Sequence, residues 1–233
     1  MLIKNIRCEL EKNADKKIRE GSRRFFKEEI ICHGMKTADV TKIAKKYFKL
    51  VKDESKSAIF EMCEELWQGG YMEESFIACN WSYAVRKNFT PQDFKIFQKW
   101  IDAYITNWAA CDTFCNHTVG AILEMYPEHV AGLKKWAKSK NRWMRRAAAV
   151  SLIVPARRGM FLDDIFETAD MLLTDEDDMV QKGYGWLLKV ASQPHLKEVF
   201  NYVMKNKSAM PRTALRYAIE KMPQDLKSKA MKR

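Results

Sequence analysis

The chain has 233 residues, enough for one large domain or two small ones with a sizeable core. Hydrophobic residues make up 47% of it and charged residues 30%, which excludes an intrinsically disordered protein. Lysine and arginine number 41 against 30 acidic side chains, and the resulting net charge of +11 favours a polyanionic partner.

The N-terminal segment and the cysteines bear on where the protein works. The N-terminus, MLIKNIRCELEKNADKK, is charged from residue 4 and lacks the apolar block of a signal peptide. No apolar run approaches the ~18 residues that a membrane span needs, so no membrane partner is expected. The six cysteines are scattered through apolar helical patterns. Free thiols in a reducing compartment, and a cytoplasmic location, are therefore expected.

Helical periodicity runs through nearly every segment, and no segment alternates like a strand for long. The helix starts are, in chain order, Thr37 before ADVTKIAKKYFKLV, Thr90 with Pro91 before QDFKIFQKWIDAYI, Pro127 before EHVAGLKKWAKS, and Asp175 or Glu176 before DDMVQKGYGWLLKVAS. The pattern predicts roughly a dozen helices joined by short connections.

Three later segments resemble one another: NRWMRRAAAVSLIV (141–154), DDMVQKGYGWLLKVAS (177–192) and SAMPRTALRYAIEKM (208–222). Arg146, Lys182 and Arg212 fall at similar places in them, 36 and 30 residues apart. A period of about 30–40 residues with paired helices is typical of HEAT or armadillo repeats. We therefore predict an all-α, armadillo-like α-α superhelix of HEAT-like antiparallel helical repeats. It would form a single domain over 1–233, with 225–233 as a frayed basic tail.

Small residues recur in these segments, including Ala147, Ala148, Gly183 and Gly185. They permit either close packing between helices or close approach of a ligand to the backbone. Close helix packing is the commoner use of such residues and is the interpretation preferred here.

The segment NWAACDTFCNHTVG (107–120) places Trp108 and Asp112 four residues apart, on one face of a helix. From this spacing alone, a buried aspartate bonded to a neighbouring helix is the simpler interpretation of Asp112. Cys111, Cys115 and His117 do not form a metal-binding pattern, because His117 lies on another face and no second cysteine pair follows. No metal or cofactor is therefore expected.

A family resemblance changes the interpretation of Asp112. NWAACD, RWMRRAA and QKGYGWLL, in this order and spacing, and the later PRTALRYAIEKM, resemble the DNA alkylation repair proteins of the AlkD type. The resemblance extends from about Thr37 to Met222. It implies a superhelix of HEAT-like repeats with a basic concave face. It also implies a DNA glycosylase that hydrolyses the bond between deoxyribose and a positively charged 3- or 7-alkylpurine.

Carried over by position, the resemblance implies a catalytic set of Asp112, Trp108 and Trp186. The DNA-binding set that it implies is Arg146, Arg145, Lys182, Arg212, Thr37 and Lys36. The partner would be double-stranded DNA with alkylated bases, bound by a monomer that needs no cofactor.

The sequence departs from the family pattern in two places. Ala109 and Ala110 stand where relatives often have a larger or acidic residue after the tryptophan, and Phe25 lies about where some relatives have a tyrosine. Two alternatives to excision remain open. One is a non-enzymatic binder of damaged or branched DNA that uses the same basic groove, and the other is a HEAT-type protein scaffold.

Overall fold

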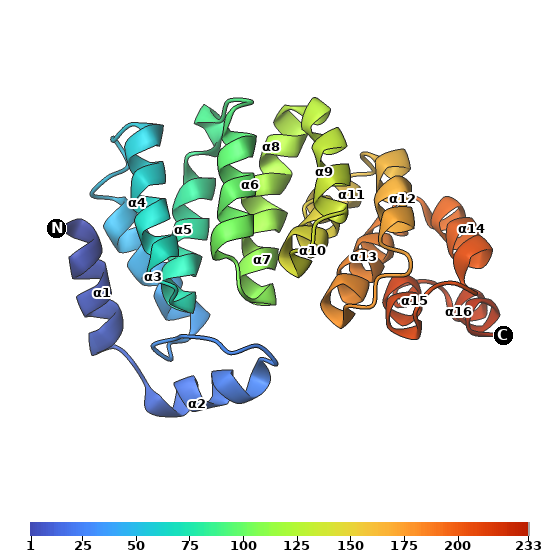
Figure 1. The fold of residues 1–233 in the computed structure, drawn as a ribbon, viewed down its shortest axis with the longest axis horizontal. Helices are drawn as coiled ribbons and strands as arrows, with labels where there is room; N and C mark the ends of the chain where they lie inside the picture. Colours follow the sequence, from blue (N-terminus) through green and yellow to red (C-terminus); the bar gives the residue numbers. More distant parts are fainter. Residues whose placement is uncertain (233) are drawn as a thin grey trace. The chain divides into compact units, whose positions relative to one another are not determined.

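The computed structural model describes residues 1–232, and helices make up its regular structure (Figure 1). No β-strand occurs in this range, although an isolated bridge joins Ile31 to Tyr71. The chain divides into two compact units, Met1–Phe114 and a second unit that begins at Cys115. The predicted all-α class is confirmed.

The first unit contains α1 (Leu2–Lys12), α2 (Lys16–Phe25), α3 (Thr37–Phe48), α4 (Lys56–Gln68), α5 (Met72–Ala84), the 3-10 helix η1 (Arg86–Asn88), α6 (Asp93–Tyr104) and α7 (Trp108–Phe114). Polar side chains fix several of its helix starts. Asp15 accepts a hydrogen bond from the backbone N–H of Ile18 at 2.9 Å, and Ser55 accepts one from Ala58 at 3.2 Å. Each bond satisfies a backbone donor that the helix itself leaves without a partner.

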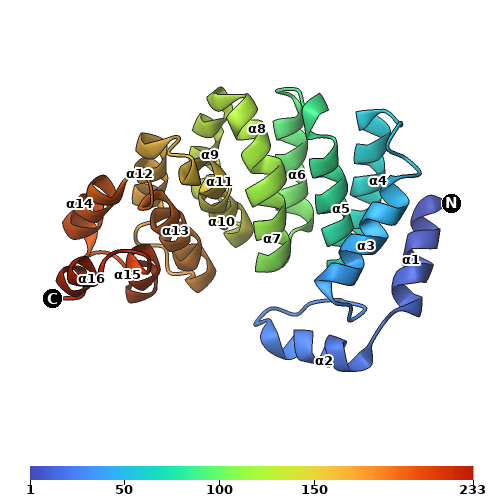
Figure 2. The same cartoon turned by 180° about the vertical axis from the view of Figure 1, so that it is seen from behind.

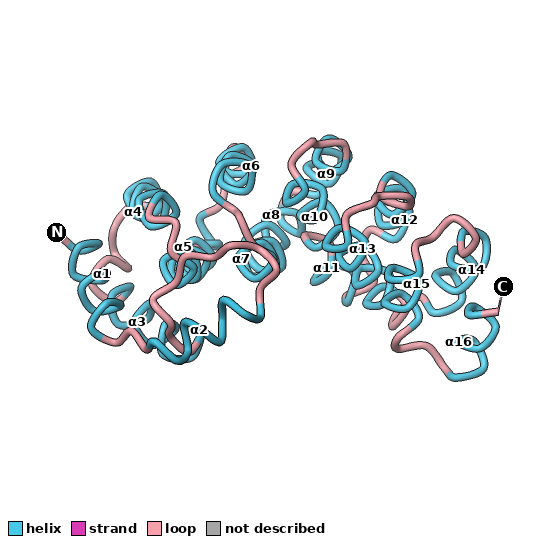
Figure 3. The backbone as a smooth tube through the Cα atoms, turned by 60° about the horizontal axis from the view of Figure 1, so that its bottom comes forward, coloured by secondary structure: helices cyan, strands magenta, loops and turns pink. Residues whose placement is uncertain are grey.

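Within the first unit, α3, α5 and α7 pack side by side in one layer, and α4 and α6 form a second layer against it (Figure 3). Aromatic side chains fill the space between these layers. Trp67, Trp81, Trp100, Phe97 and Phe114 are each at most 1% exposed. Helix α5, at the centre of the α3–α5–α7 layer, is therefore buried over most of its length.

The loop between α2 and α3 is held by a buried carboxylate. Glu73, at the start of α5, is 1% exposed and accepts hydrogen bonds from three successive backbone N–H groups. These belong to His33 at 3.0 Å, Gly34 at 2.9 Å and Met35 at 3.1 Å. The His33 ring also stacks on Tyr71, with centroids 4.2 Å apart. One side chain thus fixes the path of the loop that leads into α3.

The second unit contains the π-helix η2 (Cys115–Val119), α8 (Gly120–Met125), the 3-10 helix η3 (Pro127–His129), α9 (Val130–Ala137), α10 (Arg142–Val150), α11 (Ile153–Arg157), α12 (Leu162–Met171), α13 (Asp178–Ala191), α14 (Leu196–Asn206), α15 (Arg212–Ile219) and α16 (Gln224–Met231). Here α10, α13 and α15 lie side by side, and α9, α12 and α14 pack against them (Figure 2). The three segments that resemble one another in sequence thus form one layer.

Two glycines allow this layer to pack closely. A Cβ atom at Gly185 would lie 2.7 Å from the Cβ of Tyr217 and 2.8 Å from the carbonyl oxygen of Ala214, both on α15. A Cβ at Gly183 would lie 3.3 Å from Cγ of Arg146 on α10. Close helix packing, the preferred interpretation of these residues, therefore explains Gly185.

This packing predicts a clear cost for Gly185→Ala. The added methyl would press on the α15 backbone, and overpacking of this kind costs about 1–3 kcal/mol. Gly21→Ala is the matched control, because a Cβ at Gly21 in exposed α2 meets nothing within 4 Å. That change is expected to be neutral or to stabilise slightly. Thermal unfolding of both variants tests the prediction, and equal midpoints would contradict it.

Helix boundaries follow the sequence signals to within a few residues. Helix α3 begins at Thr37, and α13 begins at Asp178 with Asp177 as its N-cap. Most of the segment expected as a basic tail forms α16, which starts after Pro223 and buries Ala230; Arg233 lies outside the described residues. The prediction of one domain over the whole chain stays a prediction.

Candidate nucleic-acid interface and catalytic site

Helix α7 presents the first two candidate residues. The buried Asn107 fixes its start, because its Oδ1 accepts a hydrogen bond from the backbone N–H of Ala110 at 2.9 Å. Trp108 is the first helical residue and Asp112 follows one turn later. Both are half-buried, whereas Ala110 and Cys111 between them are buried. Trp108 and Asp112 therefore share the open face of this helix, as their spacing predicted.

Two phenylalanines surround the indole of Trp108. Phe26 stacks on it with centroids 5.2 Å apart and planes 19° apart. Phe25 meets it edge-on at 5.9 Å, and its side chain is 71% exposed. Both residues lie where α2 ends and the following loop begins. Phe25 is the position where some relatives have a tyrosine, and the stacking of Phe26 on Trp108 depends on the tertiary structure.

Helix α13 carries the third candidate, Trp186, one turn after Lys182. Both side chains are half-buried. Asp178, Lys182 and Trp186 are spaced four residues apart, so they lie on one face of α13. The Nζ atom of Lys182 donates a hydrogen bond to Asp178 at 2.7 Å, and the lysine side chain is 27% exposed. The second unit thus brings an aromatic face and a cation together on one helix.

Arg145 and Arg146 lie on α10, and protein groups engage both of them. Arg145 is half-buried and pairs with Asp175 at 2.6 Å. It also donates to the carbonyl of Ser139 at 3.0 Å. Arg146 is 5% exposed and donates to the carbonyl of Met179 on α13. These contacts tie α10 to the start of α13, so each arginine supports the fold whatever else it contacts.

The remaining candidates for DNA binding lie at helix starts. Lys36 and Thr37 begin α3, and Arg212 begins α15; all three are exposed. Sequence reasoning passed over Arg216, which is exposed one turn after Arg212 on the same face. Their spacing of four residues was the signal that could have found this pair.

Helix α2 is a second basic feature, outside the predicted DNA-binding set. It reads KKIREGSRRF, has no buried residue and holds a single acidic side chain. Its cations are Lys16, Lys17, Arg19, Arg23 and Arg24. Because Phe26 follows directly, this charge lies beside the aromatic group around Trp108. A run of basic residues interrupted by one glutamate was the signal in the sequence.

The possible metal ligands and the thiols both lie within residues 1–232. No group of three or more His, Cys, Asp or Glu side chains within this range is placed to hold a metal ion. None of the six cysteines forms a disulfide; Cys8 is exposed and the other five are buried. Burial raises the pKa of the Cys63 thiol far above its usual range, so this thiol stays protonated. Within the same residues, no helix combines the length and apolar character of a membrane span.

The comparisons with known proteins identify the family and the fold. Residues 6–222 match the family described as DNA alkylation repair enzyme, and the chain therefore belongs to that family. Membership places the protein in the repair of alkylation damage to DNA. A solved structure described as a predicted DNA alkylation repair enzyme from Enterococcus faecalis is similar in fold, with a TM-score of 0.82 and 14% identity. The similarity covers 91% of this chain and 98% of that one. No curated protein matches the sequence significantly.

Proposed function

We propose that the protein is a DNA glycosylase that releases positively charged alkylated purines, of the 3-methyladenine and 7-methylguanine type, from double-stranded DNA. The observation that carries the proposal is the shared open face of Trp108 and Asp112 on α7, in a chain of the alkylation repair family. We also propose that it acts as a cytoplasmic monomer without a metal or cofactor. Six cysteines without a disulfide among them suit a reducing compartment.

The chemistry of the substrate explains why one carboxylate is enough. Alkylation of a purine ring nitrogen makes the base cationic, so the base leaves without a strong general acid. The bond between C1′ of deoxyribose and the base nitrogen breaks, and positive charge builds up on the sugar as in glycoside hydrolysis. Asp112 would stabilise that charge and accept a proton from the water that attacks C1′. The products are the free alkylpurine and an abasic site.

The two indoles would act on the same developing charge. The face of a tryptophan attracts a nearby cation by about 0.5–2 kcal/mol, more when water is excluded. Trp108 already has one face against Phe26, so the stack fixes the orientation of its ring. Trp186 is half-buried on the open face of α13. By the family resemblance alone, we assign both residues to holding the sugar while the bond breaks.

Cations with exposed or partly exposed side chains would hold the phosphate backbone. Lys182, Arg212, Lys36 and the first turn of α3 at Thr37 remain the proposed contacts, with Arg216 added beside Arg212. Arg145 and Arg146 can contribute positive charge near the surface, but their guanidinium groups also bond Asp175 and Met179. A phosphate bound there would have to share these donors.

Base release from a duplex with one 7-methylguanine tests the proposal. We expect free 7-methylguanine to accumulate with the wild-type protein and an abasic site to remain in the strand. Binding to this duplex without any base release would contradict the glycosylase activity. It would support the alternative, a non-enzymatic binder of damaged or branched DNA, and branched duplexes would then be the next ligands to measure.

The salt dependence of binding tests the backbone contacts. Each lost phosphate contact is expected to reduce the slope of log affinity against log salt by about 1. We expect this change for Lys182→Ala and for Arg212→Ala, with weaker binding to every duplex sequence. Lys95→Ala is the matched control, because Lys95 is exposed on α6, in the layer away from α7. Slopes that match the control in both variants would remove these residues from the interface.

A further inference from the structure

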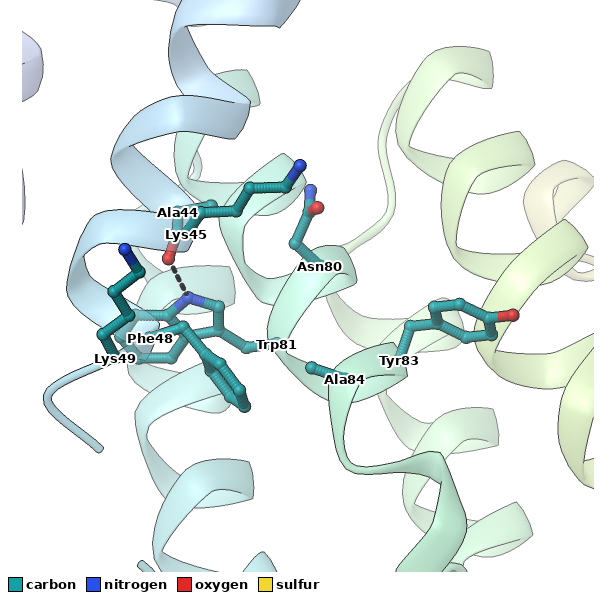
Figure 4. Close-up of a pocket in the computed structure, with 8 residues that line it drawn as sticks. All are labelled: Ala44, Lys45, Phe48, Lys49, Asn80, Trp81, Tyr83 and Ala84. Carbon is teal, nitrogen blue, oxygen red and sulfur yellow. Dashed lines mark hydrogen bonds between the residues drawn. The ribbon is translucent and has the colours of Figure 1, made fainter. Parts of the chain in front are cut away.

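A cavity of about 350 Å³ opens between the last turns of α3 and α5 (Figure 4). This volume lies within the range of about 300–1,000 Å³ typical of small-ligand pockets. The lining residues are Ala44, Lys45, Phe48, Lys49, Asn80, Trp81, Tyr83 and Ala84. All lie in the first unit, and neither the candidate catalytic set nor the candidate DNA-binding set uses any of them.

The floor of the cavity is apolar and aromatic. Trp81 is 1% exposed, and its Nε1–H donates to the carbonyl of Ala44 at 2.9 Å, so its polar group is already satisfied. Phe48 packs 6.0 Å from Trp81, centroid to centroid, and is half-buried. Phe48 therefore offers an aromatic surface whose orientation is held by its contact with Trp81. Such a surface suits a flat, unsaturated ring.

The rim of the cavity is positive. Lys45, in the last turn of α3, and Lys49, directly after the helix, are both exposed, and neither side chain makes a hydrogen bond or ion pair within residues 1–232. No carboxylate lines the cavity, so the two ammonium groups are not neutralised there. In Figure 4 the tips of Lys45 and Asn80 extend toward each other at one edge, while Tyr83 points away from α3. Charge of this sign selects an anionic ligand.

Asn80 adds a group that can recognise a base. Its Nδ2 donates one hydrogen bond, to the carbonyl of Phe76 at 2.7 Å. The second amide hydrogen and Oδ1 remain available to a ligand. An asparagine amide that offers one donor and one acceptor matches the edge of adenine at N6 and N7.

The cavity opens on the same layer as the candidate catalytic helix. Helices α3, α5 and α7 are neighbours, and α4 and α6 cover the other side of α5 and its neighbours. On α5, Asn80 is half-buried and Ala84 is exposed, and on α7 both Trp108 and Asp112 are half-buried.

We infer that this cavity binds one unstacked nucleotide of DNA, with its base against Phe48 and its edge on Asn80, and with its phosphates between Lys45 and Lys49. The inference rests on the proposed function only in taking DNA as the partner. Adenine is the expected base, because Asn80 offers the complementary donor and acceptor. The site is separate from Asp112 and does not take part in bond cleavage.

Equilibrium binding to two short duplexes tests this inference. One duplex is fully paired, and the other has the same sequence with a single unpaired adenine. We expect the wild-type protein to bind the bulged duplex about tenfold more tightly, because stacking on an aromatic side chain contributes an effect of this size. Phe48→Leu keeps the apolar filling but removes the ring, so the preference should disappear. Asn80→Ala should reduce it.

The lysines and a control variant separate charge from base recognition. The double variant Lys45→Ala/Lys49→Ala should weaken binding to both duplexes, whereas Lys95→Ala on α6 should bind both as the wild type does. Thermal unfolding verifies that each variant is folded. Equal wild-type affinity for the two duplexes would overturn the inference, and so would a preference that survives Phe48→Leu. A glutamate-rich peptide that binds in a Phe48-dependent way would instead assign the cavity to an acidic protein segment.

Base release from the paired 7-methylguanine duplex, measured in parallel with wild-type protein, separates this inference from the proposed function. Base release without any bulge preference overturns the inference and leaves the glycosylase standing. A bulge preference that depends on Phe48, without base release, supports the cavity and removes the glycosylase.

Discussion

Asp112→Asn is expected to bind an alkylated duplex as tightly as the wild type and to release the base at least about 100-fold more slowly. Removing one preorganised group that stabilises transition-state charge typically costs a factor of about 10²–10³. Asparagine keeps the shape of the side chain but cannot carry the negative charge that opposes the sugar cation. Single-turnover release of 7-methylguanine, with protein in excess over DNA, measures the chemical step directly.

Two comparisons sharpen this measurement. Asp163→Asn removes an exposed carboxylate from α12 and should release the base at the wild-type rate. This control changes the net charge of the protein by the same amount as Asp112→Asn. Binding of the damaged duplex to Asp112→Asn, followed by fluorescence anisotropy, should match the wild type. Full activity in Asp112→Asn would exclude this carboxylate from the mechanism. It would return Asp112 to the simpler interpretation, a structural aspartate on a packed helix.

The sequence predicts the helices well because their signals are local. Periodic apolar residues and polar caps act within about four residues, and both can be read without knowing the fold. The start of α3 at Thr37 and the layer formed by α10, α13 and α15 follow from such signals. The close approach at Gly185 is different, because Tyr217 and Ala214 become its neighbours only after α15 has packed.

The candidate site divides in the same way. The shared face of Trp108 and Asp112 needs only the helical repeat of 3.6 residues, so spacing predicts it. The buried Arg146 bonds to the carbonyl of Met179, 33 residues later, and no local sequence pattern predicts that contact. The stack of Phe26 on Trp108 and the cavity beside Phe48 also join segments far apart in sequence. Contacts of this kind require the tertiary structure.

The catalytic roles rest on a different argument from the helices. Spacing alone favours a structural Asp112, and family membership is what makes a catalytic aspartate the better hypothesis. The structure adds that Asp112 is half-buried and shares its face with Trp108. Its part in base release therefore stays a prediction.

Glu73→Gln is expected to lower the free energy of unfolding by roughly 3 kcal/mol, the largest effect of a single substitution on stability proposed for this chain. A charged hydrogen bond contributes about 1.5–3 kcal/mol, and a buried donor left without a partner costs about 1–3 kcal/mol. The glutamate places its two oxygens on the N–H groups of His33, Gly34 and Met35. Glutamine offers one oxygen, so its NH₂ group must face at least one of these donors.

Two measurements separate this effect from general loss of stability. Glu61→Gln is the control, because Glu61 is exposed on α4, and its denaturation midpoint should match the wild type. In Glu73→Gln, amide hydrogen exchange should accelerate first in residues 26–36, the loop that the carboxylate holds. Because Phe26 lies at the beginning of that loop, its stack on Trp108 should loosen as well. Unchanged exchange there, together with an unchanged midpoint, would show that the loop is held by packing rather than by Glu73.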